Sequence, residues 1–342
     1  MSRTSDILDG QPLSGPEAAA LAAEAERAGE TLARARTEIG KAVFGQDRVV
    51  ELALACVLAG GHGLLVGAPG LAKTRLVAAM AKVLGLDWAR VQFTPDLMPA
   101  DILGSEVLDQ DEAGKRHFRF VKGPVFTQLL MADEINRASP RTQSALLQAM
   151  QERQVTIAGV PHDVPEPFHV LATQNPIEHE GAYPLPEAQL DRFLLQIDVP
   201  YPDSETERRI LVETTGLAED APQTVLNAQT LMALQTLVRR MPVGEKVLAS
   251  ILALVRSARP GSSADPRVNQ HVAWGPGPRA GQALMLACRA RALLRGRLAP
   301  ALDDVAALAR PALAHRMSLS FGARADGLDI DTLVDDLAAK AA

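Results

Sequence analysis

The stretch Gly67-Ala68-Pro69-Gly70-Leu71-Ala72-Lys73-Thr74 decides the fold of this chain. It follows a short apolar run, Leu64 to Val66, and precedes a segment whose apolar residues recur at helical spacing until Gly85. A strand, a glycine-bearing loop, a lysine, a hydroxyl and a helix in this order predict a site for a nucleoside triphosphate. The loop backbone turns its N–H groups towards the phosphates, and the positive end of the helix dipole adds to the attraction.

Two side chains of this phosphate loop (residues 67–74) carry the expected chemistry. Lys73 would reach the β- and γ-phosphate oxygens, and the Thr74 hydroxyl would ligate Mg²⁺. The strict pattern has glycine immediately before the lysine, whereas this chain has Ala72. One methyl group can be accommodated there if the loop keeps its shape. The alternative interpretation, an ordinary strand–turn–helix with chance glycines, is disfavoured by the rest of the chain.

A second apolar run, Gln128 to Ala132, ends in Asp133 and Glu134. This pattern predicts a buried parallel strand that delivers two carboxylates at its carboxyl end. Asp133 would orient Mg²⁺ and its water, and Glu134 would polarise the attacking water. The alternative is an Asp-Glu pair that only caps the following helix.

Two further polar residues lie next to predicted strands. Asn175 closes the buried strand Phe168 to Gln174, where its amide could hold the attacking water or read the γ-phosphate. The alternative is an asparagine that only makes a turn. Arg192 lies at a helix end before the last predicted strand, Leu194 to Val199, where it could project from the core surface. Its alternative role is an ion pair with Asp191 or another local acid.

Two other positions are candidates for ligand contacts. Arg279 stands at the start of a predicted helix, where the dipole disfavours a cation, so an anionic ligand explains it better than local stability does. Phe44 and Gly45 occupy a turn between two predicted helices, upstream of the first strand. That turn could wrap a flat ligand such as adenine, although Phe44 could equally belong to the core.

The order of the segments predicts an α/β fold followed by a helical domain. We expect a mobile tail over residues 1–15, an α/β nucleotide-binding core with a leading helix over 16–200, and an all-helical lid over 201–342. Alternating segments at 105–121 and from 154 to 160 predict two hairpins. After Tyr201-Pro202-Asp203 the strand pattern ends, and Ser204 to Glu207 forms a capping box that opens the first lid helix.

Composition narrows the class of protein. The 342 residues carry 35 basic and 41 acidic side chains, and this acidic balance argues against a dedicated nucleic-acid binder. Cys56 and Cys288 lie far apart in apolar helical segments, so both are expected to be buried in a protein of a reducing compartment. The start lacks a secretory apolar core and no run approaches membrane-spanning length, which indicates a cytoplasmic protein without a membrane span.

In combination, these motifs resemble those of the MoxR family of AAA+ ATPases. The similar segments are the phosphate loop, Ala132 to Arg137, Ala172 to Pro176, Leu185 to Phe193 and Pro278-Arg279. They occur in the family's order, cover nearly all of the chain and are specific in combination. The resemblance implies a P-loop AAA+ core with a smaller helical lid, and alanine before the lysine is usual in such proteins.

The resemblance also implies roles for individual residues. Asn175 would be the sensor-1 residue, Arg192 the arginine finger that reaches a neighbouring subunit, and Arg279 the sensor-2 residue. Arg137 competes with Arg192 for the role of the finger. Gly275 to Pro278 is richer in proline than the segment usual before the sensor-2 helix, which leaves the posture of Arg279 open. The assembly implied is a homo-oligomeric ring, commonly a hexamer.

The activity implied is Mg²⁺-dependent hydrolysis of ATP to ADP and phosphate. It would drive a chaperone that remodels, activates or assists metal insertion into a protein partner, in some cases one with a von Willebrand factor A domain. A nucleic-acid-associated AAA+ motor is the first alternative, disfavoured by the acidic balance and by the absence of a basic or aromatic-stacking stretch. An ATP-gated assembly scaffold with slow turnover is the second, disfavoured by the presence of both Glu134 and Arg192.

Overall fold

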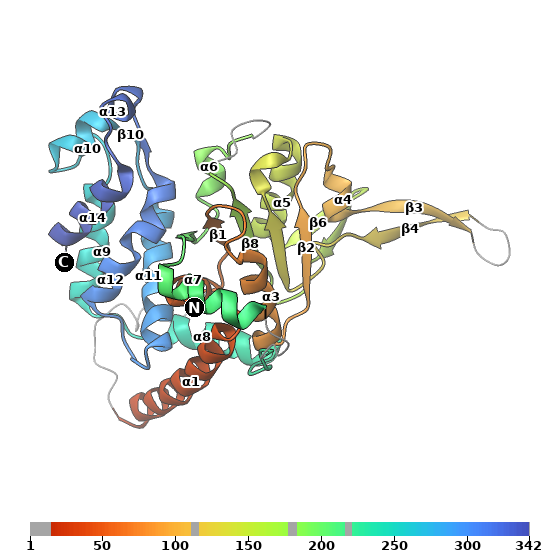
Figure 1. Cartoon of the computed structure of the whole chain (residues 1–342), viewed down its shortest axis with the longest axis horizontal. Helices are drawn as coiled ribbons and strands as arrows, with labels where there is room; N and C mark the ends of the chain where they lie inside the picture. Colours follow the sequence, from red (N-terminus) through yellow and green to blue (C-terminus); the bar gives the residue numbers. More distant parts are fainter. Residues whose placement is uncertain (1–14, 111–115, 177–182, 216–220, 342) are drawn as a thin grey trace.

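The chain folds into an α/β body with a helical region on one side and a long hairpin projecting from the other (Figure 1). The computed structural model describes residues 15–110, 116–176, 183–215 and 221–341. The predicted tail, apart from Gly15, and the tip of the first predicted hairpin therefore lie outside the described residues.

A five-stranded sheet in the order β2-β5-β8-β1-β9 forms the centre of the body. Its strands are β1 (Gly63–Val66), β2 (Trp88–Gln92), β5 (Leu129–Asp133), β8 (His169–Gln174) and β9 (Leu195–Asp198). All neighbouring strands pair in parallel, so their carboxyl ends lie along one edge. Residues of β5 and nearly all of β8 are buried, which explains their continuous apolar runs.

The helices of this part of the chain flank the sheet or pack on helices that do, as the predicted fold class requires. They are α1 (Pro16–Gly40), α2 (Asp47–Leu58), α3 (Lys73–Leu84), α4 (Pro99–Leu103), α5 (Pro140–Glu152) and α6 (Glu187–Leu190). The start of α5 follows from its sequence, because the Ser139 side chain accepts a hydrogen bond from the Thr142 N–H and Pro140 takes the first helical position. The α/β fold class is confirmed.

Both predicted hairpins are present. The first pairs β3 (Gly104–Gln110) with β4 (Arg116–Lys122) and projects from the body, and the second pairs β6 (Gln154–Ile157) with β7 (Val160–Asp163) (Figure 1). The rings of Phe120 and His162 stack at 4.3 Å, so the two hairpins touch. Farther out, Leu108 and Phe118 face each other across the first hairpin and are 55% and 69% exposed.

The C-terminal region is helical. Its helices are α7 (Ser204–Thr214), α8 (Ala228–Arg240), α9 (Glu245–Ser257), α10 (Pro266–His271), α11 (Pro278–Leu294), α12 (Leu302–Leu313), α13 (Phe321–Ala325) and α14 (Ile330–Ala341). It also contains an antiparallel pair, β10 (Val272–Trp274) and β11 (Ser318–Leu319), which the sequence analysis did not predict. Strands of three and two residues are too short to show an alternating pattern. The domain boundary at residue 200 stays a prediction.

The predicted start of α7 needs a correction of one residue. The N-cap is Asp203 and not Ser204, because the Asp203 carboxylate accepts a hydrogen bond of 2.8 Å from the Thr206 N–H. A carboxylate at the N-cap also interacts favourably with the helix dipole.

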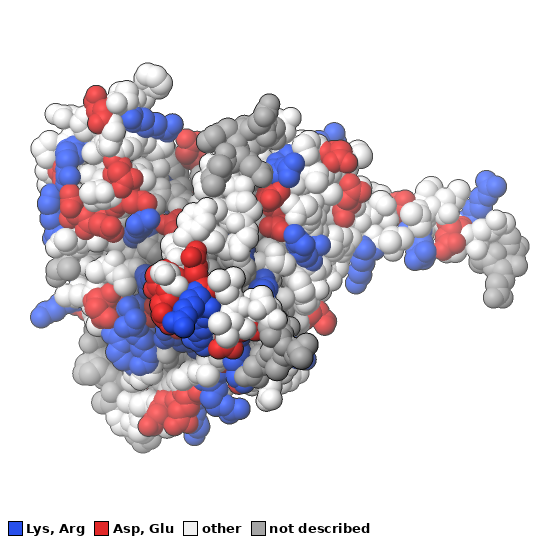
Figure 2. Space-filling model, viewed as in Figure 1, with Lys and Arg blue, Asp and Glu red and all other residues white. Residues whose placement is uncertain are grey.

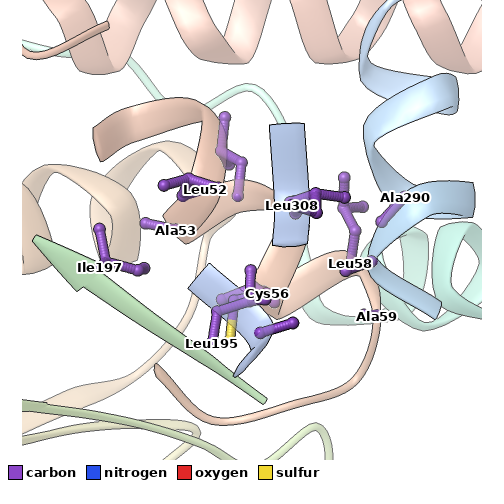
Figure 3. Packing of buried hydrophobic residues seen from close by; sticks show 14 of the residues in the cluster. Leu52, Ala53, Cys56, Leu58, Ala59, Leu195, Ile197, Ala290 and Leu308 are labelled. Atoms are coloured by element: carbon purple, nitrogen blue, oxygen red, sulfur yellow. The ribbon is translucent and has the colours of Figure 1, made fainter. Parts of the chain in front are cut away.

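Helix α2 lies inside a core shared by the sheet and the C-terminal helices. Cys56 of α2 packs beside Leu195 of β9, and Leu308 of α12 and Ala290 of α11 approach the same helix (Figure 3). From Val49 to Leu58 every residue is buried, as expected for a helix enclosed on all sides. Both cysteines are buried, as predicted, and burial raises the pKa of Cys56 to about 12.

Buried ion pairs accompany this apolar packing. Glu51 of α2 is only 4% exposed, and its carboxylate accepts a hydrogen bond of 2.9 Å from Arg295 at the end of α11. Arg291 of α11 pairs with Asp304 of α12, a residue with no exposed surface, and Arg297 donates to the same carboxylate at 2.7 Å. These charges join α2 to α11 and α12.

Replacing Asp304 by asparagine is therefore expected to destabilise the fold by about 3 kcal/mol, because Arg291 would lose its fully buried counter-charge and keep only Glu51 at 3.5 Å and the more exposed Asp303 at 3.3 Å. The neighbouring Asp303, whose side chain is 55% exposed, serves as the matched control, and its change to asparagine should cost less than about 1 kcal/mol. Urea unfolding of the two variants measures the difference. Equal losses would contradict a special role for the buried carboxylate.

Candidate active site

The phosphate loop lies at the carboxyl edge of the sheet, between β1 and α3. The Gly67 N–H donates a hydrogen bond of 3.2 Å to the Gln174 carbonyl at the end of β8. Ala72 has a φ of 56°, in the left-handed region that favours glycine. This backbone explains why the strict pattern has glycine there, and it shows that the loop keeps its turn with alanine.

The Lys73 ammonium points back into the loop. It donates to the Gly67 carbonyl at 2.6 Å and to the Ala68 carbonyl at 2.7 Å. Partial burial lowers the pKa of Lys73, while the charges of Asp133 and Glu134 act in the opposite direction. A partly buried cation held by neutral carbonyls, at the start of a helix, is well placed to meet an anion.

Asp133 is the last residue of β5, and the residue is 8% exposed. One oxygen of its carboxylate accepts a hydrogen bond of 2.6 Å from the Thr173 hydroxyl, and the other accepts 2.6 Å from Arg90. The side chain is thus fixed at the same sheet edge as Lys73.

Glu134 follows with a left-handed backbone, at a φ of 55°. Its N–H donates to the Thr173 hydroxyl at 2.8 Å, and its carboxylate accepts from Gln92 at 2.7 Å and from Arg137 at 3.0 Å. It precedes a short 3-10 turn (Ile135–Arg137), yet within the described chain its side chain makes no capping bond to that turn. The interpretation of Asp133 and Glu134 as a mere helix cap is therefore wrong.

Arg90, Gln92 and Thr173 are contacts that the sequence analysis missed. Arg90 and Gln92 project from β2, which pairs with β5, and Thr173 comes from β8 on the other side. Their alternation on β2 was visible in the sequence, but the pairing of β2 with β5 was not.

Asn175 follows β8 and is 6% exposed. Since β8 lies between β5 and β1, the end of β8 separates the two acids from the phosphate loop. The strand before Asn175 therefore pairs directly with the strand that ends in Asp133.

The turn at Phe44 and Gly45 is tied to the phosphate loop, because the Gln46 amide donates to the Leu71 carbonyl at 3.1 Å. Helix α7 covers this turn. The Arg209 guanidinium lies 4.9 Å from the Phe44 ring centroid, and a methyl group at Gly45 would collide with Thr206. Phe44 is half-buried, so it remains accessible to a ligand.

Arg192 and Arg279 lie at the opposite edge of the sheet. Arg192 precedes β9, whose first residue Leu195 pairs with Gly63 at the start of β1. Both arginines line a pocket of about 310 Å³ together with His62, which directly precedes β1. The structure therefore does not bring these arginines to the Lys73 of their own chain.

The partners of these arginines differ from those expected. Asp191 receives a hydrogen bond of 2.7 Å from the buried Arg316 and lies 3.9 Å from Arg279. Across the described ranges, no ion pair or hydrogen bond engages the Arg192 guanidinium, so the alternative pairing with Asp191 is wrong. Arg137, by contrast, pairs with Glu134 at the carboxyl edge.

Mg²⁺ suits this donor set. Among the described residues there is no cluster of three or more His, Cys, Asp or Glu that could hold a metal by itself. Mg²⁺ commonly uses one or two protein oxygens and takes the rest from phosphates and water, which Asp133 and Thr74 beside a triphosphate would allow.

The described residues also contain no helix with the length and hydrophobicity needed to cross a membrane.

Comparisons with known proteins agree with this geometry. Residues 62–195 match the family model of the ATPase family associated with various cellular activities (AAA), and residues 264–337 match the AAA lid domain. Chaperone MoxR1 of Mycobacterium tuberculosis is 42% identical over 306 residues, which span 89% of this chain and 80% of that protein. Protein MoxR of Methylorubrum extorquens is 34% identical over 309 residues, covering 85% and 88%. The crystal structure of a candidate ATPase from Cytophaga hutchinsonii has a TM-score of 0.87 at 34% identity and covers 95% of this chain and 98% of its own.

Proposed function

Because the chain belongs to the MoxR family of AAA+ ATPases, we propose that it hydrolyses ATP to ADP and phosphate with Mg²⁺ and uses this turnover to remodel a protein partner. The observation that carries the proposal is the gathering of Lys73, Asp133, Glu134 and Asn175 at one edge of the sheet. These groups come from the ends of two strands and from one loop, and together they supply what phosphoryl transfer needs.

The phosphates would be held by the backbone N–H groups of the loop and by Lys73. In this state the Lys73 ammonium would exchange the Gly67 and Ala68 carbonyls for phosphate oxygens. Asp133 and Thr74 would hold Mg²⁺, which when bound neutralises charge on the phosphates. Arg90 has a side chain that is 46% exposed, so it can release Asp133 without loss of buried packing.

Glu134 would act on the attacking water, with Asn175 beside it. The contacts from Gln92 and Arg137 hold the Glu134 carboxylate, which makes these two positioning residues in our proposal. Glu134 can accept a proton only when a water replaces at least one of these donors.

Arg192 and Arg279 would act on the nucleotide of a neighbouring subunit. They lie at the edge of the sheet opposite to their own phosphate loop, so one chain alone leaves the γ-phosphate without an arginine from this pocket. A homo-oligomeric ring, with six subunits as the resemblance suggests, would bring the amino edge of one subunit to the carboxyl edge of the next. The Arg192 guanidinium, which has no partner in the described chain, would then find one.

The partner would be a protein, in some cases one with a von Willebrand factor A domain, and the outcome its activation or metal loading. The exposed pair Leu108 and Phe118 on the projecting hairpin offers an apolar surface for it. A nucleic-acid motor is less well supported, since acidic and basic residues interleave on the face shown in Figure 2 instead of forming one basic surface.

The Lys73→Ala variant tests the nucleotide site. Loss of a charge-assisted contact of about 1.5–3 kcal/mol should weaken ATP binding about 10- to 100-fold while the fold stays intact. Calorimetric titration with ATP measures this, with circular dichroism as the check on folding. Lys82→Ala, at the exposed end of the same helix, is the matched control and should bind ATP as the parent does. Unchanged affinity in Lys73→Ala would place the nucleotide elsewhere.

A further inference from the structure

Helices α9 and α11 enclose an apolar groove of about 630 Å³. Its lining includes Leu248, Leu252, Met285 and Leu286, together with the two arginines Arg256 and Arg259. Leu252 is 54% exposed, which is unusual for a leucine in a helix with five buried positions. We call this surface the α9–α11 groove.

Helix α7 presents an apolar surface of its own. All eleven residues of α7 are described and none is buried. Leu211 is 66% exposed and Val212 is 69% exposed, and both lie one turn after the exposed Glu207 and Arg208. Because α7 has no fully buried residue, packing against its own chain stabilises it little, and a partner surface would be needed to cover Leu211 and Val212.

The groove adjoins the arginine pocket. Gln282 and Leu286 line both, and Arg279 lies one helical turn before Gln282 on α11. Any subunit whose nucleotide meets Arg192 and Arg279 of its neighbour therefore also lies beside the neighbour's α9–α11 groove.

Helix α7 adjoins the nucleotide side. Thr206 packs against Gly45 and Arg209 covers Phe44, in the turn that the Gln46 amide ties to the phosphate loop. An interface that places the arginines of one subunit beside the phosphates of the next would thus also place the groove of the first subunit beside α7 of the second. Of the two exposed charges that lie one turn before Leu211 and Val212, Glu207 could pair with Arg256 or Arg259 of the groove, whereas Arg208 could not.

We propose that the α9–α11 groove of one subunit receives Leu211 and Val212 of α7 from the next subunit. The inference rests on the ring of the proposed function and adds the contact that holds neighbouring subunits together. Helix α7 also covers the Phe44 turn. Binding of a nucleotide at that turn would therefore affect the contact between α7 and the groove of the neighbouring subunit.

A cysteine pair tests the contact directly. Leu211→Cys combined with Leu252→Cys, oxidised in the presence of Mg²⁺ and a slowly hydrolysed ATP analogue, should give disulfide-linked dimers and larger species on a non-reducing gel. Only a link between chains changes the size. Each single variant, and Leu211→Cys combined with Gln270→Cys on the exposed part of α10, should remain monomeric on the gel. The native Cys56 and Cys288 are buried and should not take part.

A charge in the contact provides the second test. Leu211→Asp with Val212→Asp should leave ATP binding intact, weaken assembly at least tenfold in sedimentation and lower turnover accordingly. Val160→Asp, a residue 52% exposed on the second hairpin, is the matched control and should assemble as the parent does.

The outcomes separate this inference from the proposed function. Oligomers that form and hydrolyse ATP, yet neither cross-link nor respond to the aspartates, overturn the α7 contact alone. Normal assembly combined with loss of a partner protein's binding would assign α7 to the partner and also overturn it. If the chain binds ATP but stays monomeric under every condition, both the proposed ring and the α7 contact are wrong.

Discussion

Replacing Glu134 by glutamine is expected to slow ATP hydrolysis about 10²- to 10⁴-fold while ATP binding remains. The amide keeps the shape of the side chain and can still contact Gln92, but it cannot accept a proton from the attacking water. Lys73, Thr74 and Asp133 stay in place, so the groups that hold the triphosphate and Mg²⁺ are unchanged. Phosphate release at saturating ATP measures the rate, and calorimetric titration measures the binding.

The matched control for this variant is Glu152→Gln, an exposed acid at the end of α5 and therefore at the other edge of the sheet. It removes the same charge at a distance from the phosphate loop and should hydrolyse ATP at the parent rate. Turnover near the parent rate in Glu134→Gln would remove Glu134 from the mechanism. A loss of ATP binding as large as the loss of rate would instead show that the carboxylate holds the nucleotide.

Local patterns predicted the carboxyl edge of the sheet. The phosphate loop is one continuous stretch of sequence, and so is the strand that ends in Asp133. In a parallel sheet, the residue that follows a strand lies at the carboxyl edge. Asn175 follows another predicted strand, so its place at this edge could be predicted for the same reason. Each of these predictions needed only the strand and the residues that follow it.

Contacts between distant strands and helices could not be predicted in this way. Gln92 reaches Glu134 only because β2 pairs with β5, and one sequence contains no signal for strand order. Asp191 has Arg192 as its neighbour in sequence, yet it pairs with Arg316, which is 125 residues away. The guanidinium of Arg316 is buried away from water, so it needs a carboxylate as partner more than the accessible Arg192 does. Asp191 therefore pairs with Arg316.

The residues to which we assign catalytic roles lie at two different edges of the sheet. The nucleotide groups occupy the carboxyl edge, and Arg192 and Arg279 occupy the amino edge of the same sheet. No rotation of a side chain can carry an arginine across the length of a strand. In the proposed mechanism, Arg192 and Arg279 therefore reach a γ-phosphate only when it is bound to a second copy of the chain.

The Arg192→Ala variant is accordingly expected to lose about 10³- to 10⁵-fold in turnover, the range known for arginines that act on a phosphoryl group from a neighbouring subunit. ATP binding and assembly should persist, since within the described chain the guanidinium takes part in no ion pair. Phosphate release and sedimentation measure the two properties. Arg324→Ala, an exposed arginine on α13, removes the same charge elsewhere and should keep the parent rate.

Mixing inactive variants shows on which subunit Arg192 acts. In a mixture of Arg192→Ala and Glu134→Gln, some interfaces join an intact Glu134 to an intact Arg192, so activity should partly return. A mixture of Arg137→Ala and Glu134→Gln is the matched control. Arg137 pairs with Glu134 in its own chain, so no interface in that mixture restores a complete site. Rescue in the second mixture and not in the first would make Arg137 the arginine that crosses the interface. Parent-rate hydrolysis by an assembled Arg192→Ala protein would exclude Arg192 from catalysis altogether.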